Sequence, residues 1–303
     1  MMHRMSFRLF SVLIAGFISI QTASTQNVIL GVLEENHGHY AGEPNYRSVR
    51  AVFEKKDGDW RPLRSDCRDR ECLKTATSSY PREMIWTIAF DGKNVGQVTS
   101  RTPQDFMWYS SLGQQEIISS GPVPTIGSRS SEFGGYTDAV VYRPLIANSQ
   151  QYFADPDRWK PSTTSPALTT ALQQAFRNKF PKLCRLSGAE HNTLEPLLYR
   201  NEEVKIVKAY TSASGRIVAR LHLEGVDCAD VEAGFDIDDP WFVIDTKKSI
   251  TYLDSGLWLV DAGDYDNDGR SELVFSINRD NEGGYEIYYD DFRKHSTFKL
   301  NYH

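Results

Sequence analysis

The 303-residue sequence lacks a surplus of positive charge and has few cysteines. Lysine and arginine number 34 against 40 aspartates and glutamates, which gives a formal net charge of −6. Surfaces that bind nucleic acid need an excess of positive charge to neutralise phosphates. We therefore expect no nucleic-acid partner.

Sequence motifs of common enzyme classes are also missing. No Gly-x-Ser-x-Gly nucleophile motif occurs, and the Gly/Ser-rich stretch 128–135 has no Lys-Ser/Thr pair for phosphate. With 40 acidic residues, any two could be proposed as a glycosidase pair, so acidic content carries little information. The sequence leaves enzymatic activity open and favours a non-enzymatic role.

Residues 1–26 have the features of a secretory signal peptide. Arg4 and Arg8 give a basic start, residues 9–20 are apolar, and small and polar residues follow at 22–25. The apolar run is shorter than the roughly 20 residues that span a bilayer, although an N-terminal anchor helix is the alternative. We expect a mature chain of residues 27–303, secreted or periplasmic, with no membrane span and one β-rich domain.

The four cysteines, Cys67, Cys72, Cys184 and Cys228, all lie in the exported part. An even number of cysteines in an oxidising compartment predicts disulfides, and three pairings are possible. The short spacing favours Cys67–Cys72, which leaves Cys184–Cys228 as the second bridge. Buried free thiols are the alternative.

Strand-like segments joined by turn signals recur along the chain. The turns fall at Asp57-Gly58, Asp91-Gly92, 212–215, 245–248 and 264–272. Hairpins at intervals of roughly 30–45 residues are typical of an all-β propeller built from small sheets. We therefore predict an irregular β-propeller-like array of hairpins, with a β-sandwich assembly as the alternative.

One helix interrupts this pattern at about residues 163–181. Ser165 is suited to its N-cap and Pro166 to its first position. Apolar residues then recur at helical spacing until Pro181. We expect a helical insertion packed against the edge of a sheet.

An acidic loop at residues 264–272 carries the most specific chemistry. Carboxylates stand at positions 1, 3, 5 and 9, with a glycine at position 6 that permits a sharp turn. Such a set of hard oxygen donors suits Ca²⁺. The expected ligands are the side chains of Asp264, Asp266, Asp268 and Glu272, together with the backbone carbonyl of Arg270. A solvated acidic turn without an ion is the alternative.

The stretch 263–275 resembles the calcium loop of FG-GAP (integrin-α type) and VCBS repeats, with a Gly-Asp opening, alternating acids, Asp-Gly and an apolar strand. It departs from these families in occurring once and in having Glu272 where Asp is usual. Phe275 stands where an EF-hand has its last glutamate. The rest of the chain resembles secreted bacterial proteins in general. The resemblance implies that the ion stabilises the fold.

Together these patterns predict an exported calcium-binding protein of binding or structural type. Its partner would be an extracellular or envelope ligand, either protein or glycan. The competing hypothesis is a secreted polysaccharide hydrolase or lyase with its cleft in the loop-rich stretch 121–161. A deep cleft with a buried carboxylate pair would favour the enzyme, and an exposed aromatic patch would favour the binding protein.

Overall fold

The structure, a computed structural model, describes residues 27–36, 44–126, 142–151, 154–187, 193–226, 239–279 and 282–301. The described residues are mostly β: 47% of them lie in strands and 13% in helices. The predicted all-β class is therefore confirmed.

The N-terminal half folds into a seven-stranded antiparallel sheet in the order β1-β7-β4-β5-β6-β2-β3. Pairing of β1 with β2 closes six of these strands into a barrel, and β3 extends from β2. The strands are β1 (Ile29–Asn36), β2 (Tyr46–Lys56), β3 (Asp59–Pro62), β4 (Glu83–Phe90), β5 (Lys93–Arg101), β6 (Gln114–Ile117) and β7 (Leu145–Asn148).

The barrel closes around Trp86, which is fully buried. Its indole Nε1 donates to Ser100 Oγ at 2.6 Å, so the polar end of the ring is satisfied inside the core. Gly31 on β1 makes room for the ring, since a Cβ there would lie 2.8 Å from the Arg50 carbonyl oxygen and 3.3 Å from Trp86. Closure of the barrel thus depends on the small residue Gly31, which leaves space for the large side chain of Trp86.

Two antiparallel sheets follow the barrel in the chain. The five-stranded sheet has the order β14-β13-β12-β11-β8, and the four-stranded sheet, called the central sheet below, has the order β15-β16-β17-β18. Their strands are β8 (Lys160–Pro161), β11 (Lys205–Thr211), β12 (Ile217–His222), β13 (Trp241–Ile244), β14 (Ile250–Tyr252), β15 (Leu257–Gly263), β16 (Glu272–Arg279), β17 (Glu282–Tyr289) and β18 (Lys294–Asn301).

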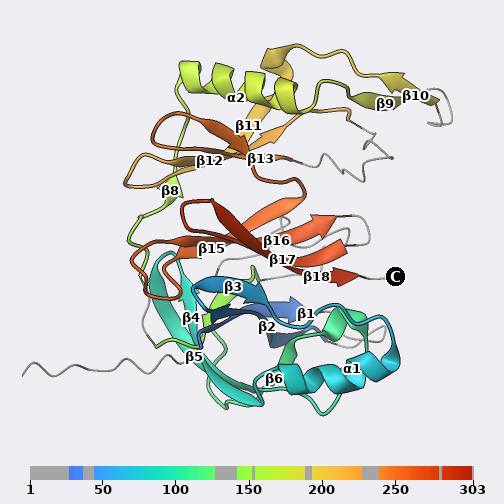
Figure 1. The fold of residues 1–303 in the computed structure, drawn as a ribbon, viewed down its shortest axis with the longest axis vertical. Helices are drawn as coiled ribbons and strands as arrows, with labels where there is room; N and C mark the ends of the chain where they lie inside the picture. The colour runs from blue at the N-terminus through green and yellow to red at the C-terminus, as the bar shows by residue number, and fades with distance from the viewer. Residues whose placement is uncertain are drawn as a thin grey trace, which may run out of the picture.

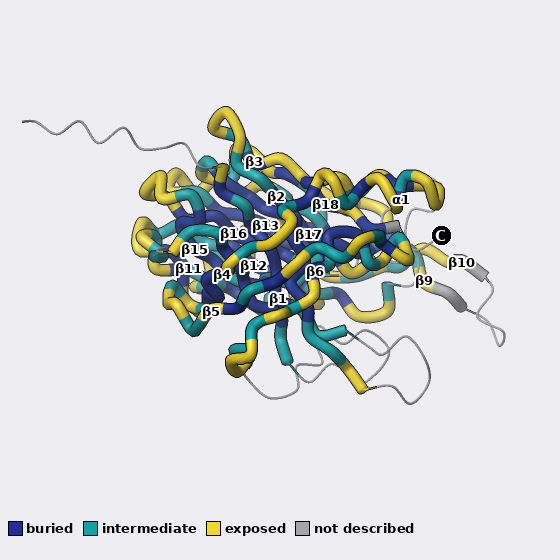
Figure 2. Tube along the Cα trace, turned by 90° about the horizontal axis from the view of Figure 1, so that it is seen from below, coloured by how far each residue is buried: buried dark blue, intermediate teal, exposed yellow. Residues whose placement is uncertain are grey.

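The central sheet lies between the barrel and the five-stranded sheet, as Figure 1 shows. Val274 and Ile287 belong to the same buried cluster as the barrel core. Phe275 and Tyr288 belong to a second cluster with Trp241 of the five-stranded sheet. Because both faces of the central sheet are covered, β16 and β17 are buried along most of their length rather than at alternate residues. Figure 2, seen from the barrel end, shows the buried strands surrounded by exposed turns.

Helices cover the two ends of this stack. They are α1 (Arg70–Ala76), α2 (Pro166–Lys179) and the short 3₁₀ turns η1 (Thr77–Ser79), η2 (Tyr109–Ser111) and η3 (Asn201–Glu203). Ser165 caps α2 by accepting from the backbone N–H of Leu168, as the sequence predicts. Leu172 and Phe176 pack on the outer face of the five-stranded sheet, beside Phe242. The predicted helix is confirmed, and it covers the face of a sheet rather than an edge.

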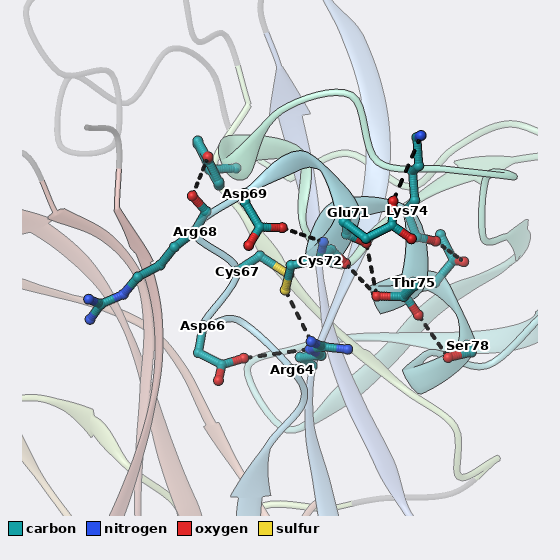
Figure 3. Close-up of a disulfide and its surroundings, with 12 residues drawn as sticks. Arg64, Asp66, Cys67, Arg68, Asp69, Glu71, Cys72, Lys74, Thr75 and Ser78 are labelled. Carbon is teal, nitrogen blue, oxygen red and sulfur yellow. Dashed lines mark hydrogen bonds and ion pairs between the residues drawn. A yellow bond between two sulfur atoms is a disulfide. The ribbon is translucent and has the colours of Figure 1, made fainter.

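The predicted disulfide Cys67–Cys72 is present, with a Cα–Cα distance of 5.3 Å. Figure 3 shows it at the start of α1, where Asp69 accepts from the backbone N–H of Cys72 at 2.7 Å. Cys184 in β9 (Cys184–Ser187), which pairs with β10 (Thr193–Pro196), is also disulfide-bonded. Its expected partner Cys228 lies outside the described residues.

A propeller-like array of hairpins is not confirmed, because the largest sheet closes on itself as a barrel instead. The predicted hairpin turns do occur at Asp57-Gly58 and Asp91-Gly92, and β13 turns into β14 at residues 245–248. Within the described ranges, no helix is long and apolar enough to cross a membrane.

Candidate metal centre

The acidic loop joins β15 to β16 at one end of the central sheet, where Gly263 pairs with Glu272. Its first residue is fixed by a backbone bridge to another part of the chain: the N–H of Asp264 donates to the carbonyl of Ala154 at 2.7 Å. The loop therefore lies where the central sheet meets the segment that leads from the barrel to the five-stranded sheet.

Three carboxylates converge in this loop. Asp264, Asp266 and Asp268 each place an oxygen within 4.8 Å of the others. The turn that brings them together has Asn267 at φ +60° and Gly269 at φ +88°, a backbone region that glycine and asparagine adopt at low cost. Three of the four predicted side-chain ligands are thus brought together.

Backbone N–H groups already hold the Asp264 carboxylate in place. The N–H of Asp268 donates to Oδ1 at 2.9 Å, and the N–H of Gly269 donates to Oδ2 at 2.8 Å. Burial nevertheless raises the pKa of Asp264, and the neighbouring charges of Asp266 and Asp268 raise it further. Crowded carboxylates with this electrostatic cost are stabilised by a cation placed among them.

Glu272 has a different environment from the one expected. It is 2% exposed and lies outside the group of three aspartates. Its Oε2 accepts from the backbone N–H of Tyr265 at 2.8 Å. Burial raises its pKa well above the usual value, and Asp266 adds to this effect. As the first residue of β16, Glu272 supports the loop from the sheet side in this structure.

Arg270 contributes its side chain to the loop. Its guanidinium donates to Asp268 Oδ2 at 2.9 Å and pairs with Asp290 after β17. These two carboxylates raise the pKa of Arg270 above its usual value. Coordination by the Arg270 carbonyl, which the spacing of the loop predicts, stays a prediction.

The structure adds a cation that sequence analysis missed. Lys55 Nζ on β2 lies 2.5 Å from Asp266 Oδ2, with the two side chains 15% and 5% exposed. The rings of Trp60 and Tyr289 lie 5.2 Å and 5.1 Å from the same ammonium. No signal in the sequence points to this pair, because the two residues are far apart in the chain.

Two further aspartates hold the exit of the loop. Ser271 Oγ donates to Asp155 Oδ1 at 2.5 Å, and the Ser271 N–H donates to Asp157 Oδ2 at 3.2 Å. Asp157 also pairs at 2.6 Å with Arg216, in the turn that joins β11 to β12 of the five-stranded sheet. The loop is therefore tied to every layer of the stack, and an ion bound there would act on all of them.

The alternative cleft at 121–161 receives little support. Residues 127–141 and 152–153 of that stretch lie outside the described residues. Pockets of about 490, 710 and 380 Å³ occur in the described part of the chain, and of their described lining residues only Pro161 belongs to this stretch. The carboxylates of this stretch that the structure describes, Asp155 and Asp157, are half-buried and accept hydrogen bonds from Ser271 at the exit of the acidic loop, and neither lines one of these pockets.

No family model, curated protein or solved structure matches the chain. The resemblance of residues 263–275 to FG-GAP and VCBS loops therefore stays a prediction, and the function has to be argued from the geometry.

Proposed function

We propose that this chain is an exported, calcium-binding β-rich protein of binding or structural type, in which the ion stabilises the β15–β16 hairpin. The observation that carries the proposal is the convergence of Asp264, Asp266 and Asp268 within 4.8 Å around a tight turn. Oxygen donors alone suit a hard cation, and carboxylates of unequal exposure in an irregular loop suit Ca²⁺ better than Mg²⁺, which needs tight octahedral geometry.

The position of the loop supports a stabilising role rather than a catalytic one. Lys55 connects it to the barrel, and Asp157 with Arg216 connects it to the five-stranded sheet. The disulfide Cys67–Cys72 supports export through a signal peptide at residues 1–26, because such bridges persist in oxidising compartments. The stacking of two antiparallel sheets, β11–β14 and β15–β18, supports a blade-like arrangement of the C-terminal half.

The test is calorimetric titration of chelator-treated protein with Ca²⁺. We expect one ion per chain, with a stability gain of about 2.7 kcal/mol at a hundredfold excess over the dissociation constant. Asp268→Asn and Asp266→Ala should each weaken binding about tenfold or more, since each removes a charged ligand. Mg²⁺ should bind more weakly.

The control variant is Glu71→Gln, which removes an exposed carboxylate on α1, away from the loop. It should bind Ca²⁺ as the wild type does. A wild-type protein that takes up no Ca²⁺ would refute the proposal, and so would aspartate variants that bind the ion as tightly as the control.

A further inference from the structure

Two pockets adjoin on the barrel, and Pro103 and Glu116 line both of them. One has a volume of about 710 Å³ and the other about 380 Å³. Together they form a continuous surface along β6 and the segment that precedes it, which is called the barrel groove below. It is separate from the acidic loop and plays no part in the proposed calcium site.

The larger pocket has a mixed polar and apolar lining and carries two guanidinium groups. Arg82 and Arg101 line it together with hydroxyl and amide side chains: Thr77, Ser78, Thr102 and Gln104. A guanidinium nitrogen of Arg101 lies 3.6 Å from a carboxylate oxygen of Glu116, and the two side chains are 55% and 70% exposed. An ion pair this exposed contributes little to stability. The side chain of Arg82 is exposed and makes no ion pair within the described residues. The pocket therefore offers positive charge on a protein whose net charge is −6.

The smaller pocket is apolar and ends in exposed aromatic surface. Trp108 is 58% exposed and Met107 is 51% exposed, although the adjacent Phe106 is buried in the core. Tyr46 and Ile117 complete the apolar lining. Large apolar side chains grouped at the mouth of a pocket mark interaction sites.

The walls of the groove are held rigidly. Gln115 donates to the Pro81 carbonyl and to Thr102 Oγ1, both at 2.8 Å. Thr102 Oγ1 in turn donates to the Pro81 carbonyl at 2.6 Å. The disulfide Cys67–Cys72 anchors α1, which leads directly into η1 with Thr77 and Ser78. A groove fixed in this way loses little entropy when it binds a ligand.

We infer that the barrel groove binds an acidic oligosaccharide that contains uronic-acid units. The guanidinium groups of Arg82 and Arg101 would pair with a uronate carboxylate, and the hydroxyl and amide groups beside them would bond sugar hydroxyls. The exposed face of Trp108 would stack on the apolar face of a neighbouring ring. This inference rests on the proposed binding role and does not depend on the calcium loop.

Charge and lining select this ligand among anionic ones. A densely sulfated chain would meet an acidic protein whose groove is lined by three arginines, Arg47, Arg82 and Arg101, and by two carboxylates, Asp105 and Glu116. One carboxylate per sugar ring matches the local charge better. The larger pocket supplies hydroxyl groups and the smaller one supplies the flat ring of Trp108. These two linings match a sugar ring, which has polar edges and apolar faces.

The experiment is calorimetric titration of the full chain with a galacturonic acid hexasaccharide, in the presence and absence of Ca²⁺. The methyl ester of the same hexasaccharide removes the charge and keeps the sugar rings. The variants are Trp108→Ala and the double variant Arg82→Gln/Arg101→Gln. The control is Arg185→Gln/Lys205→Gln, which removes the same charge from exposed residues of β9 and β11, at the far end of the stack.

We expect the wild type and the control to bind the acid form alike. The methyl ester, Trp108→Ala and the double arginine variant should each bind about tenfold more weakly or worse. The inference is overturned if the wild type releases no heat with the acid form, if the ester binds as well, or if the control loses as much affinity as the groove variants. Stronger binding of a tri-glutamate peptide or of heparin would also overturn it. Loss of Ca²⁺ uptake with saccharide binding intact would refute only the proposed calcium role.

Discussion

Lys55 Nζ lies 2.5 Å from Asp266 Oδ2, which joins the barrel to the acidic loop of the central sheet through one ion pair. Both side chains are largely buried, and two aromatic rings flank the ammonium. The protein thus supplies a cation of its own to one of the three carboxylates that converge in the loop. A metal ion at the same aspartates would compete with Lys55 for the charge of Asp266.

We expect Lys55→Met to bind Ca²⁺ about tenfold more tightly, because a positive charge next to a ligand disfavours a second cation. Without Ca²⁺ the same variant should be less stable by about 3 kcal/mol, since the buried Asp266 carboxylate loses its partner. Calorimetric titration and urea unfolding, each with and without Ca²⁺, measure both effects.

The matched control for this variant is Lys294→Met. Lys294 also lies over the Tyr289 ring, at 5.9 Å, but its ammonium pairs with Asp59 instead of a loop aspartate. It should leave Ca²⁺ affinity unchanged. Equal effects of the two substitutions would mean that Lys55 acts through general charge only.

Asp261 should make stability depend on pH. Its carboxylate on β15 accepts from the backbone N–H of Asp91, at 3.2 Å to each oxygen, and burial raises its pKa to about 7. A raised folded-state pKa means that the folded protein holds the proton more strongly. This contribution to stability is therefore complete below about pH 4 and is lost as the pH rises to about 7, by up to about 1.4 kcal/mol per pH unit.

Asp261→Asn should flatten this part of the profile between pH 4 and 7. Urea unfolding at intervals of half a pH unit measures the slope, with Glu71→Gln as the control for loss of an exposed carboxylate. An unchanged slope in Asp261→Asn would show that the carboxyl titrates normally in the fold.

Gly284 on β17 should tolerate no side chain. Its φ is +131°, and a Cβ would lie 2.0 Å from the Phe298 carbonyl oxygen on the neighbouring strand. Gly284→Ala should therefore cost more than about 4 kcal/mol or prevent folding. Gly58→Ala is the control, because Gly58 also has a positive φ, of +81°, but has open space around it. It should cost about 1 kcal/mol, and comparable melting temperatures of the two variants would contradict the steric argument.

The two disulfides should contribute unequally. In the chain-entropy model, the short Cys67–Cys72 loop contributes about 2 kcal/mol, and the expected Cys184–Cys228 loop contributes about 3–4 kcal/mol. Peptide mapping under non-reducing conditions tests the second pairing, and double serine variants of each pair compare their stabilities. A mapped bond between Cys184 and any other cysteine would show that the pairing prediction is wrong.

Local features of the fold were predictable from the sequence because their causes lie within a few residues. Ser165 and Pro166 mark the start of α2, and the two Asp-Gly pairs mark hairpin turns. Helix α1 is not predicted, although Asp69 caps it, because its seven residues are too few to show a helical period. Helix caps and tight turns are determined by a few neighbouring residues, so they can be recognised without the rest of the chain.

The barrel was not predictable in the same way. Its closure depends on β1 pairing with both β2 and β7, and β7 lies more than a hundred residues further along the chain. The same distinction applies to the candidate site. The spacing of the three aspartates is local, so it predicts their convergence. The ion pair of Lys55 with Asp266 depends on tertiary structure, so the sequence does not predict it. Glu272 shows where local spacing is insufficient for predicting a ligand. Its position in the motif predicts a metal ligand, but its place at the start of β16 buries its side chain.

The order of the layers has a consequence for the chain during its synthesis. The central sheet is formed by residues 257–301, yet it covers one face of the barrel and one face of the five-stranded sheet, both of which are made earlier. Both earlier layers are therefore synthesised with an apolar face uncovered, and this face stays exposed until strands β15 to β18 have been made. Over that interval the unfinished protein depends on protection from its surroundings, and the arrival of the C-terminal strands ends its exposure to aggregation and proteolysis.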